Sequence, residues 1–292
     1  MKISKVLYSE LDSSVNFVFD NMMEARYVQR TPEYFICYLS SHDGCNKACR
    51  FCHLTQTGQT SFNEATVDDY ITQAIAVLDH YRSKLEEGMP AAKHVNFNFM
   101  SRGEPLSNNQ LINGLSELNG RLRAAVEKMG LTHSLNISSI IPQDADLGKI
   151  KKAFVENKDN LLFYYSLYSL DSSFRKRWIP KSLEPCIALN FLKDLQSEMG
   201  LNLVLHWALI QGENDSIQNA QLICDQINSR ELKARFNLVR YNPYSQSQGE
   251  EATECSIQEF FEIMKNKLGD PNSRIVPKVG FDVKASCGMF VG

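Results

Sequence analysis

Three cysteines that lie close together in the sequence are the residues best suited to chemistry. Cys45, Cys49 and Cys52 fall within the segment SSHDGCNKACRFCH at residues 40–53. Thiolates at CxxxCxxC spacing can converge on one metal centre, but a structural zinc site normally has four protein ligands, and no second CxxC or HxxxH pair is present. Three thiolates suit a [4Fe-4S] cluster with one iron lacking a protein ligand, because ferredoxin-type clusters use four cysteines. Such an open iron can bind a substrate or cofactor directly.

A simpler interpretation of this loop also stays open. The three cysteines could be buried thiols, or ligands of a zinc ion with His42 or His53 as the fourth ligand. Cys186, Cys224 and Cys255 lie in or beside expected helices without metal-ligand spacing, so we interpret them as ordinary thiols. The N-terminus lacks the apolar region of a signal peptide. We therefore expect a cytoplasmic protein whose cysteines are thiols or ligands rather than disulfides.

The composition excludes several classes of protein. The 292 residues are 43% hydrophobic and 22% charged, which excludes a disordered chain, a coiled coil, a collagen-like fibre and a small disulfide scaffold. No run approaches the roughly 20 apolar residues of a membrane span, so we expect no membrane partner. The formal net charge of −3 gives no general attraction for polyanions. A nucleic-acid partner would therefore need a local basic patch.

Short runs rich in β-branched and aromatic residues predict six strands, at residues 34–39, 94–100, 134–139, 161–167, 202–209 and 235–240. Segments with apolar residues at helical spacing lie between them. This alternation predicts an α/β fold of parallel βαβ units, which an open sheet and a partial barrel would both satisfy. No low-complexity linker interrupts the series. We therefore expect one domain over residues 31–292, preceded by an N-terminal extension of residues 1–30.

The motifs that follow these strands resemble those of the radical S-adenosylmethionine (SAM) enzymes. In that superfamily the three-cysteine loop follows the first strand of a partial (β/α)6 barrel, and SAM binds the open iron. The second expected strand ends in MSRGEPL at residues 100–106, which is similar to the family's GE(P) segment. The glutamate of that segment accepts hydrogen bonds from the SAM ammonium group. The resemblance implies a TIM-like partial barrel with its site at the carboxyl ends of the strands, and with a [4Fe-4S] cluster and SAM as cofactors.

The resemblance also implies which residues bind each cofactor. Cys45, Cys49 and Cys52 would bind the cluster. The SAM contacts would come from segments that follow the second to sixth strands, at Gly103, Glu104, Asn136, Ser138, Ser166, Leu167, Tyr168 and Asn242. Two of these depart from the family pattern, because Tyr168 stands where histidine is usual and Asn136 where serine is usual.

Within the superfamily the chain is similar to the adenine-C2 methyltransferases of 23S ribosomal RNA and transfer RNA and to their C8-methylating relatives. The likeness covers residues 24–288 and is carried by SSxxGC at 40–45, GEPLxN at 103–108, FRKRWIP at 174–180, NLVxYNP at 237–243 and SCGM at 286–289. In the family, the cysteine of the last segment is methylated by one SAM and then supplies the carbon, which implies that role for Cys287. The implied activity is methylation of an adenine carbon, C2 first, through a transient covalent protein–RNA intermediate.

Two further catalytic roles are implied by the same resemblance. A second thiol must release the product by closing a disulfide with Cys287, and a general base must remove the ring proton. Cys37 is implied as the thiol and Glu24 as the proton acceptor. Cys37 lies eight residues before Cys45, one more than is usual, and one extra residue in a regular strand turns a side chain to the opposite face. We therefore expect a bulge between Cys37 and Ser40; the alternative is a buried strand thiol.

The resemblance implies RNA as the substrate, a flavodoxin or ferredoxin as the electron donor, and a monomer. The family carries an additional N-terminal RNA-binding domain, which we expect to be lacking because few residues precede Glu24. Phosphates could be contacted by the basic residues at 149–152 and 175–181, although solvated helix faces are the alternative. Two other functions stay open: a radical SAM enzyme that acts on a different nucleic-acid or protein substrate, and a non-catalytic iron–sulfur protein.

Overall fold

Six parallel strands form the centre of the computed structural model, which describes all of residues 1–292. They are β4 (Tyr34–Tyr38), β5 (His94–Phe99), β6 (Thr132–Ser139), β7 (Leu161–Tyr165), β8 (Asn202–Ala208) and β9 (Ala234–Val239). Each coincides to within about two residues with a strand predicted from the sequence. The predicted partial barrel of βαβ units is therefore confirmed.

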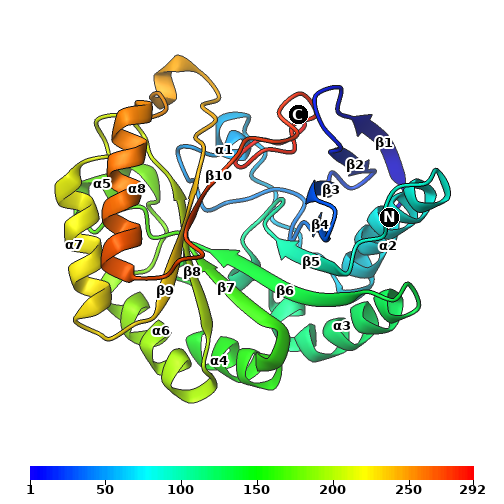
Figure 1. Ribbon diagram of the computed structural model, residues 1–292, viewed down its shortest axis with the longest axis horizontal. Coiled ribbons are helices and arrows are strands. Elements are labelled where there is room, and N and C mark those ends of the chain that lie inside the picture. The colour runs from blue at the N-terminus through cyan, green and yellow to red at the C-terminus, as the bar shows by residue number, and fades with distance from the viewer.

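Helices connect these strands and cover the outside of the sheet (Figure 1). The long ones are α2 (Val67–Glu86), α3 (Asn109–Glu127), α4 (Leu147–Glu156), α6 (Pro185–Met199), α7 (Ile217–Asn228) and α8 (Glu254–Leu268), and the short ones are α1 (His53–Gln56) and α5 (Ser172–Trp178). Polar side chains cap the long helices at their N-termini; for example, Thr66 and Asp69 form a capping box on α2. Their apolar faces and the outer face of the sheet share one core of 70 buried residues. None of the helices combines the length and the hydropathy that a membrane crossing requires.

Four further strands extend the sheet at its two edges. Residues 1–30, predicted as an extension, contribute the antiparallel strands β1 (Ile3–Tyr8), β2 (Val15–Phe19) and most of β3 (Glu24–Thr31), which pairs with β4. The short strand β10 (Arg274–Val276) pairs in parallel with β9. The result is a single ten-stranded sheet whose spatial order follows the sequence. The segment after β10 then crosses toward the β1–β3 side, where the chain ends (Figure 1).

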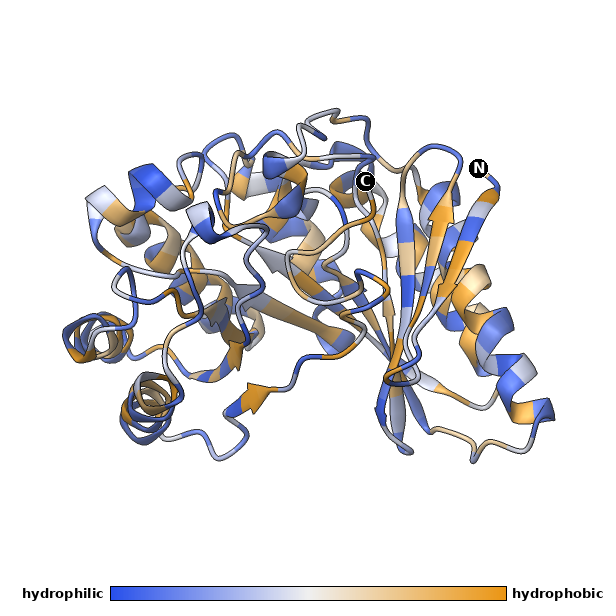
Figure 2. Cartoon of the chain, turned by 90° about the horizontal axis from the view of Figure 1, so that it is seen from above, coloured by the Kyte–Doolittle hydropathy of each residue, from blue (hydrophilic) through white to orange (hydrophobic).

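The two faces of the sheet have different environments because side chains alternate along a strand. Figure 2 shows hydrophobic and hydrophilic residues interspersed along the strands. On β4, Ile36 and Tyr38 line the cavity inside the barrel, whereas Phe35 belongs to the outer core and stacks on Tyr81 of α2 with ring centroids 4.3 Å apart. The inner face is thus free to form a binding site, while the outer face holds the helices.

Candidate active site

The three-cysteine loop forms one wall of a small pocket at the carboxyl ends of the strands. Cys45, Cys49, Cys52 and Glu104 all line this pocket of about 140 Å³, which we call the cluster pocket. Burial raises the pKa of all three thiols, that of Cys45 to about 12, and the charge of neighbouring thiolates adds to the shift for Cys45 and Cys49. Thiolates that repel one another in a buried pocket are stabilised by a cationic centre, so this donor set suits a metal cluster.

The histidines of the loop do not join the thiols. The His42 ring stacks on Phe62 with centroids 3.7 Å apart, and its Nδ1 lies 3.1 Å from Ser41 Oγ. His53 donates through Nε2 to the carbonyl oxygen of Asn242 at 3.1 Å. No three His, Cys, Asp or Glu side chains are arranged to hold a single metal ion. His42 and His53, the histidines proposed as a fourth zinc ligand, thus have other partners in this structure.

Two glycines allow the loop and the GEP turn to pack closely. Gly103 has a φ of +96°, and a Cβ at this position would lie 2.4 Å from Ser41 Oγ and 2.5 Å from His42 Nδ1. A Cβ at Gly44 would lie 2.6 Å from the carbonyl oxygen of Gln59. A larger residue at Gly103 would push the cluster loop away from the GEP turn, and one at Gly44 would push it away from the backbone at Gln59 and Ser61.

Glu104 is a buried carboxylate without a salt-bridge partner. Its side chain accepts hydrogen bonds from the backbone N–H groups of Leu106 at 3.1 Å and Ile140 at 3.4 Å. Burial raises the pKa of Glu104 to about 7, although hydrogen bonds and the nearby Lys47 act in the opposite direction. Lys47 itself is paired with Asp144 at 2.6 Å. A buried carboxylate in the cluster pocket is suited to bind an ammonium group, as the sequence implied for SAM.

The remaining residues predicted to contact SAM divide between two cavities. Ser138, Ser166 and Tyr168 line the cluster pocket with Gly103 and Glu104. Asn136 and Asn242 instead line a larger cavity of about 460 Å³ inside the barrel, which we call the barrel cavity. Leu167 is fully buried and lines neither, and its carbonyl oxygen accepts a hydrogen bond from Arg175 at 2.8 Å. Five of the eight predicted residues thus line the cluster pocket.

Cys287 lies where the two cavities meet. It lines both of them, as do Met100, His206 and Val239. The backbone around Cys287 is held by Asn242, whose Nδ2 donates to the Cys287 carbonyl oxygen at 3.0 Å, and by the N–H of His53, which donates to the Gly288 carbonyl oxygen at 3.0 Å. Its side chain is accessible within the cavities, but the surrounding protein raises the pKa of the thiol to about 11. A ligand in either cavity can thus reach this sulfur.

The structure does not bring Cys37 to Cys287. The pairing of β4 with β5 stays in register through Cys37 and Tyr38, so no bulge redirects the Cys37 side chain within β4. Cys37 is fully buried in the outer core and Tyr38 takes the inward position beside the barrel cavity. The extra residue before Cys45 therefore turns the thiol toward the helices, as a one-residue shift in a regular strand must. The role of resolving thiol implied for Cys37 has no support in this geometry.

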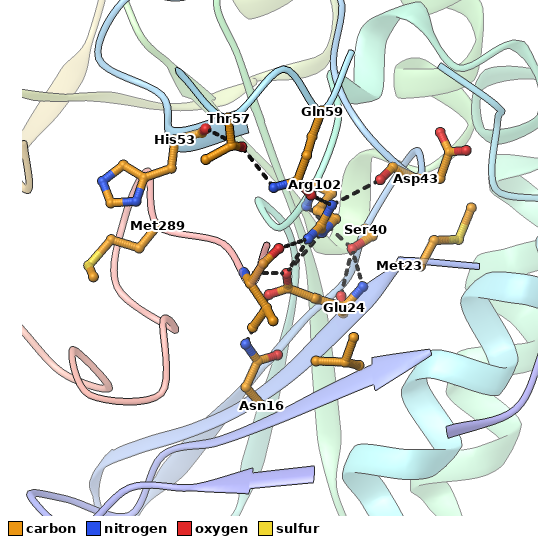
Figure 3. A network of polar contacts seen from close by, with 12 residues as sticks. Asn16, Met23, Glu24, Ser40, Asp43, His53, Thr57, Gln59, Arg102 and Met289 are labelled. Carbon is orange, nitrogen blue, oxygen red and sulfur yellow. Dashed lines mark hydrogen bonds and ion pairs between the residues drawn. The ribbon is translucent and has the colours of Figure 1, made fainter. Parts of the chain in front are cut away.

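Glu24 is the centre of a buried ionic network (Figure 3). Its Oε1 accepts hydrogen bonds from Arg102 Nε and the Val291 N–H, both at 2.9 Å. Its Oε2 accepts from Arg26 Nη2 at 2.8 Å and Asn16 Nδ2 at 2.9 Å. Burial alone would raise its pKa, but the charges of Arg26 and Arg102 hold the pKa of Glu24 below its usual value. With both oxygens occupied and neither cavity in contact with it, Glu24 is not placed to accept a proton from a substrate.

The same network fastens the C-terminal segment that carries Cys287. Arg26 donates to the carbonyl oxygen of Met289 at 2.7 Å, and Arg102 donates to the carbonyl oxygen of Val291. The three charged side chains are between 0% and 2% exposed. Their charges are therefore screened little by solvent. Glu24 acts here as a residue that positions the Cys287 segment.

The barrel cavity is basic, although the whole chain is weakly acidic. Seven lining residues are cationic and one, Glu33, is acidic; the cationic residues are Arg26, Arg30, Lys93, Arg235, Arg240, Arg274 and Lys278. Sequence reasoning missed this site. Arg26 and Arg30 are an even number of residues apart on β3, so they lie on the same face of the strand. This spacing is the signal that could have revealed the basic cavity.

Four of the seven basic residues proposed from the sequence as phosphate contacts have other partners. Arg175 is buried and donates to Leu167, Ser169, Ser182 and Leu183. Arg177 pairs with Glu213, and Lys149 and Lys151 form ion pairs with Asp146 and Glu198. The concentration of positive charge in this structure lies inside the barrel.

Comparison with known proteins finds related sequences along most of the chain. No protein-family model matches it. The chain is 27% identical over 273 residues to the dual-specificity RNA methyltransferase RlmN of Aliarcobacter butzleri (strain RM4018), covering 90% of this chain and 68% of that protein. It is 27% identical over 287 residues to the probable dual-specificity RNA methyltransferase RlmN of Deinococcus deserti, covering 95% of this chain and 77% of that one. The resemblance inferred from the motifs is confirmed.

Solved structures share the fold. A crystal structure of a radical SAM methyltransferase from Sphaerobacter thermophilus matches with a TM-score of 0.79 at 19% identity, covering 99% of this chain and 80% of that chain. Methylornithine synthase (PylB) matches with a TM-score of 0.50 at 12% identity, covering 88% and 65%. The chain therefore has the partial-barrel fold of radical SAM enzymes.

Replacing Glu24→Gln tests the ionic network. The variant leaves the charges of Arg26 and Arg102 uncompensated, so we expect a loss of about 3–5 kcal/mol in the free energy of unfolding measured with denaturant. Amide hydrogen exchange at Val291 should also become faster, because its N–H loses the carboxylate acceptor. The matched control is Glu117→Gln, which removes an exposed ion pair with Arg121 and should change neither readout. Unchanged exchange at Val291 would contradict the positioning role.

Replacing Cys37→Ala tests whether this thiol releases the product. Because Cys37 faces the helices, we expect a loss of roughly 1 kcal/mol in stability, as for an ordinary buried substitution. No covalent protein–RNA adduct should accumulate relative to wild type when the reaction is analysed on denaturing gels. Accumulation of the adduct in this variant alone would show that Cys37 reaches Cys287 and that our placement is wrong.

The pKa of Glu104 predicts how SAM binding depends on pH. Glu104 must be ionised to pair with an ammonium group, and its pKa is raised to about 7, so SAM affinity should increase as the pH rises through this value. The dissociation constant of SAM would be measured one unit on either side of it. Glu104→Gln should bind SAM more weakly and lose this pH dependence. Equal pH dependence in the variant and in wild type would exclude Glu104 as the partner of the ammonium group.

Proposed function

We propose that this chain is a radical SAM methyltransferase that methylates an adenine carbon, C2 first, of ribosomal or transfer RNA through a methylated Cys287. The observation that carries this proposal is the position of Cys287 between a pocket lined by Cys45, Cys49 and Cys52 and a basic cavity large enough for a nucleoside. The similarity to proteins named dual-specificity RNA methyltransferase supports the choice of RNA.

The need for a cysteine follows from the chemistry of the base. Adenine C2 is an electron-poor sp² carbon without a nucleophilic lone pair, so it cannot attack the methyl group of SAM. Cys287 can do so: its sulfur forms a bond to the methyl carbon while the sulfonium bond of SAM breaks, and S-adenosylhomocysteine leaves. The thiol proton must depart in this step, and the raised pKa of Cys287 makes its removal part of the barrier.

The chain's residues divide the remaining tasks between the cavities. Cys45, Cys49 and Cys52 would hold a [4Fe-4S] cluster, and the chemistry that it would supply is the one-electron cleavage of a second SAM, through which the methyl group on Cys287 would lose a hydrogen atom. Glu104 would orient the ammonium group of SAM. The basic residues of the barrel cavity would hold the RNA, and bonding of the base to the carbon on Cys287 would give the covalent intermediate.

Release of the product needs a thiol that attacks Sγ of Cys287, and Cys37 faces away from it. We therefore assign release to a thiol from solution. Before release, the adduct must lose the C2 proton to solvent and its unpaired electron to the electron-transfer partner. The thiol then forms a disulfide with Cys287 as the bond between Sγ and the transferred carbon breaks, and that carbon takes up the proton of the thiol. All eight cysteines are free, which agrees with a reducing, cytoplasmic environment. A flavodoxin or ferredoxin would supply the electron to a monomeric enzyme.

Mass analysis of protein and RNA tests this function. Protein purified without oxygen should carry a mass increase of about 14 Da on Cys287, the mass of one added methyl group. RNA from cells with the intact gene should contain a methylated adenine that is missing from cells without it. Cys287→Ala should lose both signals.

Cys255→Ala provides the matched control, because Cys255 is also accessible but lies on α8, away from both cavities. It should retain both signals at wild-type level. SAM cleavage to 5′-deoxyadenosine without any methyl group on Cys287 would instead indicate a radical SAM enzyme with a different reaction. A protein that cleaves no SAM would be a non-catalytic iron–sulfur protein.

A further inference from the structure

Three arginines of the barrel cavity have no carboxylate partner. Arg30 of β3, Arg235 of β9 and Arg274 of β10 all line the cavity, and none forms a salt bridge. Arg240 and Lys278 of the same cavity differ from them, because both pair with Glu251, at 2.9 Å and 3.5 Å. The three unpaired guanidinium groups are therefore available to an anion from outside the chain.

These arginines converge on one region of the cavity. Arg30 and Arg274 both lower the pKa of His206, in addition to the larger effect of burial. Arg235 and Arg274 both act on Tyr164, whose buried phenol has a raised pKa. Arg274 of β10 also lies opposite Asn237 of β9. Asn237 is two residues beyond Arg235, so these two side chains share one face of β9. Tyr164 and His206 contact each other edge to face, with ring centroids 5.4 Å apart. The three arginines therefore line the part of the cavity around this pair of rings.

Buried polar atoms in this region lack hydrogen-bond partners. They are Arg30 Nε, His206 Nδ1 and Asn237 Oδ1, and Asn237 as a whole is only 2% exposed. An unsatisfied buried polar group is costly, so such groups in a cavity point to a ligand that completes them. Arg30 Nε needs an acceptor such as a phosphate oxygen, whereas Asn237 Oδ1 needs a donor such as a ribose hydroxyl. A phosphate group is tetrahedral and offers several strong acceptor oxygens, two of which can pair with the planar fork of one guanidinium group. Three converging arginines suit a phosphate better than a carboxylate, which has only two oxygens.

The rest of the cavity offers partners for a nucleoside. Asn136 donates through Nδ2 to Oδ1 of Asn98 at 2.8 Å and to Oδ1 of Asn96 at 3.2 Å, and all three amides line the cavity. Amide side chains can pair with the edges of adenine, and Tyr38, also on the lining, offers an aromatic face for stacking. Cys287 lies at the other end, beyond the carboxyl end of β9, whereas Arg235 and Arg274 lie near the amino ends of β9 and β10.

We propose that Arg30, Arg235 and Arg274 bind a phosphate group of the adenine nucleotide whose base reaches Cys287. The identity of the base rests on the proposed function, whereas the phosphate site rests on the unpaired arginines alone. A free nucleotide and an RNA strand both present this chemical group. The nucleotide spans the cavity, with its phosphate near the amino ends of the strands and its base toward their carboxyl ends.

Calorimetric titration of the anaerobic, cluster-containing protein with adenosine 5′-monophosphate and with adenosine tests this site. Wild type should bind the monophosphate at least about tenfold more tightly than adenosine, as expected for charge-assisted hydrogen bonds. Arg235→Gln and Arg274→Gln should each reduce this ratio severalfold and leave adenosine binding unchanged. Arg123→Gln, an exposed arginine on α3, is the matched control and should keep the wild-type ratio. Thermal unfolding of each variant confirms that it is folded.

A short RNA with an internal adenosine separates the two sources of phosphate. Weaker RNA binding in both variants, by the same factor as for the monophosphate, identifies an RNA phosphate as the ligand; an effect on the monophosphate alone identifies a free nucleotide. Equal binding of adenosine and its monophosphate by wild type would overturn the proposal, as would an unchanged ratio in both variants. If the ratio behaves as expected but no RNA is methylated, the phosphate site stands and the proposed function fails.

Discussion

The buried ion pairs of Glu24 with Arg26 and Arg102 are the interaction on which the arrangement of the site depends. They join the start of β3 to the turn after β5 and, through Met289 and Val291, to the C-terminal segment. They act together with the hydrogen bonds from Asn242 and His53 that hold the backbone at Cys287 and Gly288. A buried ion pair contributes little net stability compared with apolar packing, but it fixes geometry. Here it fixes the sulfur between the two cavities.

The position of this sulfur explains how one chain can use two ligands. The cluster pocket offers thiols and a carboxylate, which suit a metal cluster and an ammonium group, while the barrel cavity offers arginines and amides, which suit a nucleotide. The arginines of the barrel cavity would bind an ammonium group poorly, and the acidic side chains of the cluster pocket would bind a nucleotide poorly, because like charges repel. In the proposed reaction, a methyl group that passes from SAM to the base needs an acceptor where the two cavities meet. Cys287 lies at that position.

The sequence predicted the central strands well because their signal is local: a hydrophobic run bounded by polar residues. The cysteine spacing likewise placed Cys45, Cys49 and Cys52 around one pocket. The roles of Cys37 and Glu24 were predicted less well, because they depend on which face of a strand a side chain occupies and on which distant groups it meets. Without a bulge the Cys37 thiol points outward. The arginines of the barrel cavity come from strands far apart in the sequence, so no local pattern reveals that they converge.

The central claim is that Cys45, Cys49 and Cys52 bind a [4Fe-4S] cluster with one iron open to SAM. Electron paramagnetic resonance of the reduced, oxygen-free protein tests it most directly. The account predicts the signal of a reduced [4Fe-4S] cluster, a change in that signal when SAM is added, and loss of the signal when any one of the three cysteines is replaced by alanine. A protein that contains zinc, or a cluster whose signal is unaffected by SAM, would contradict it.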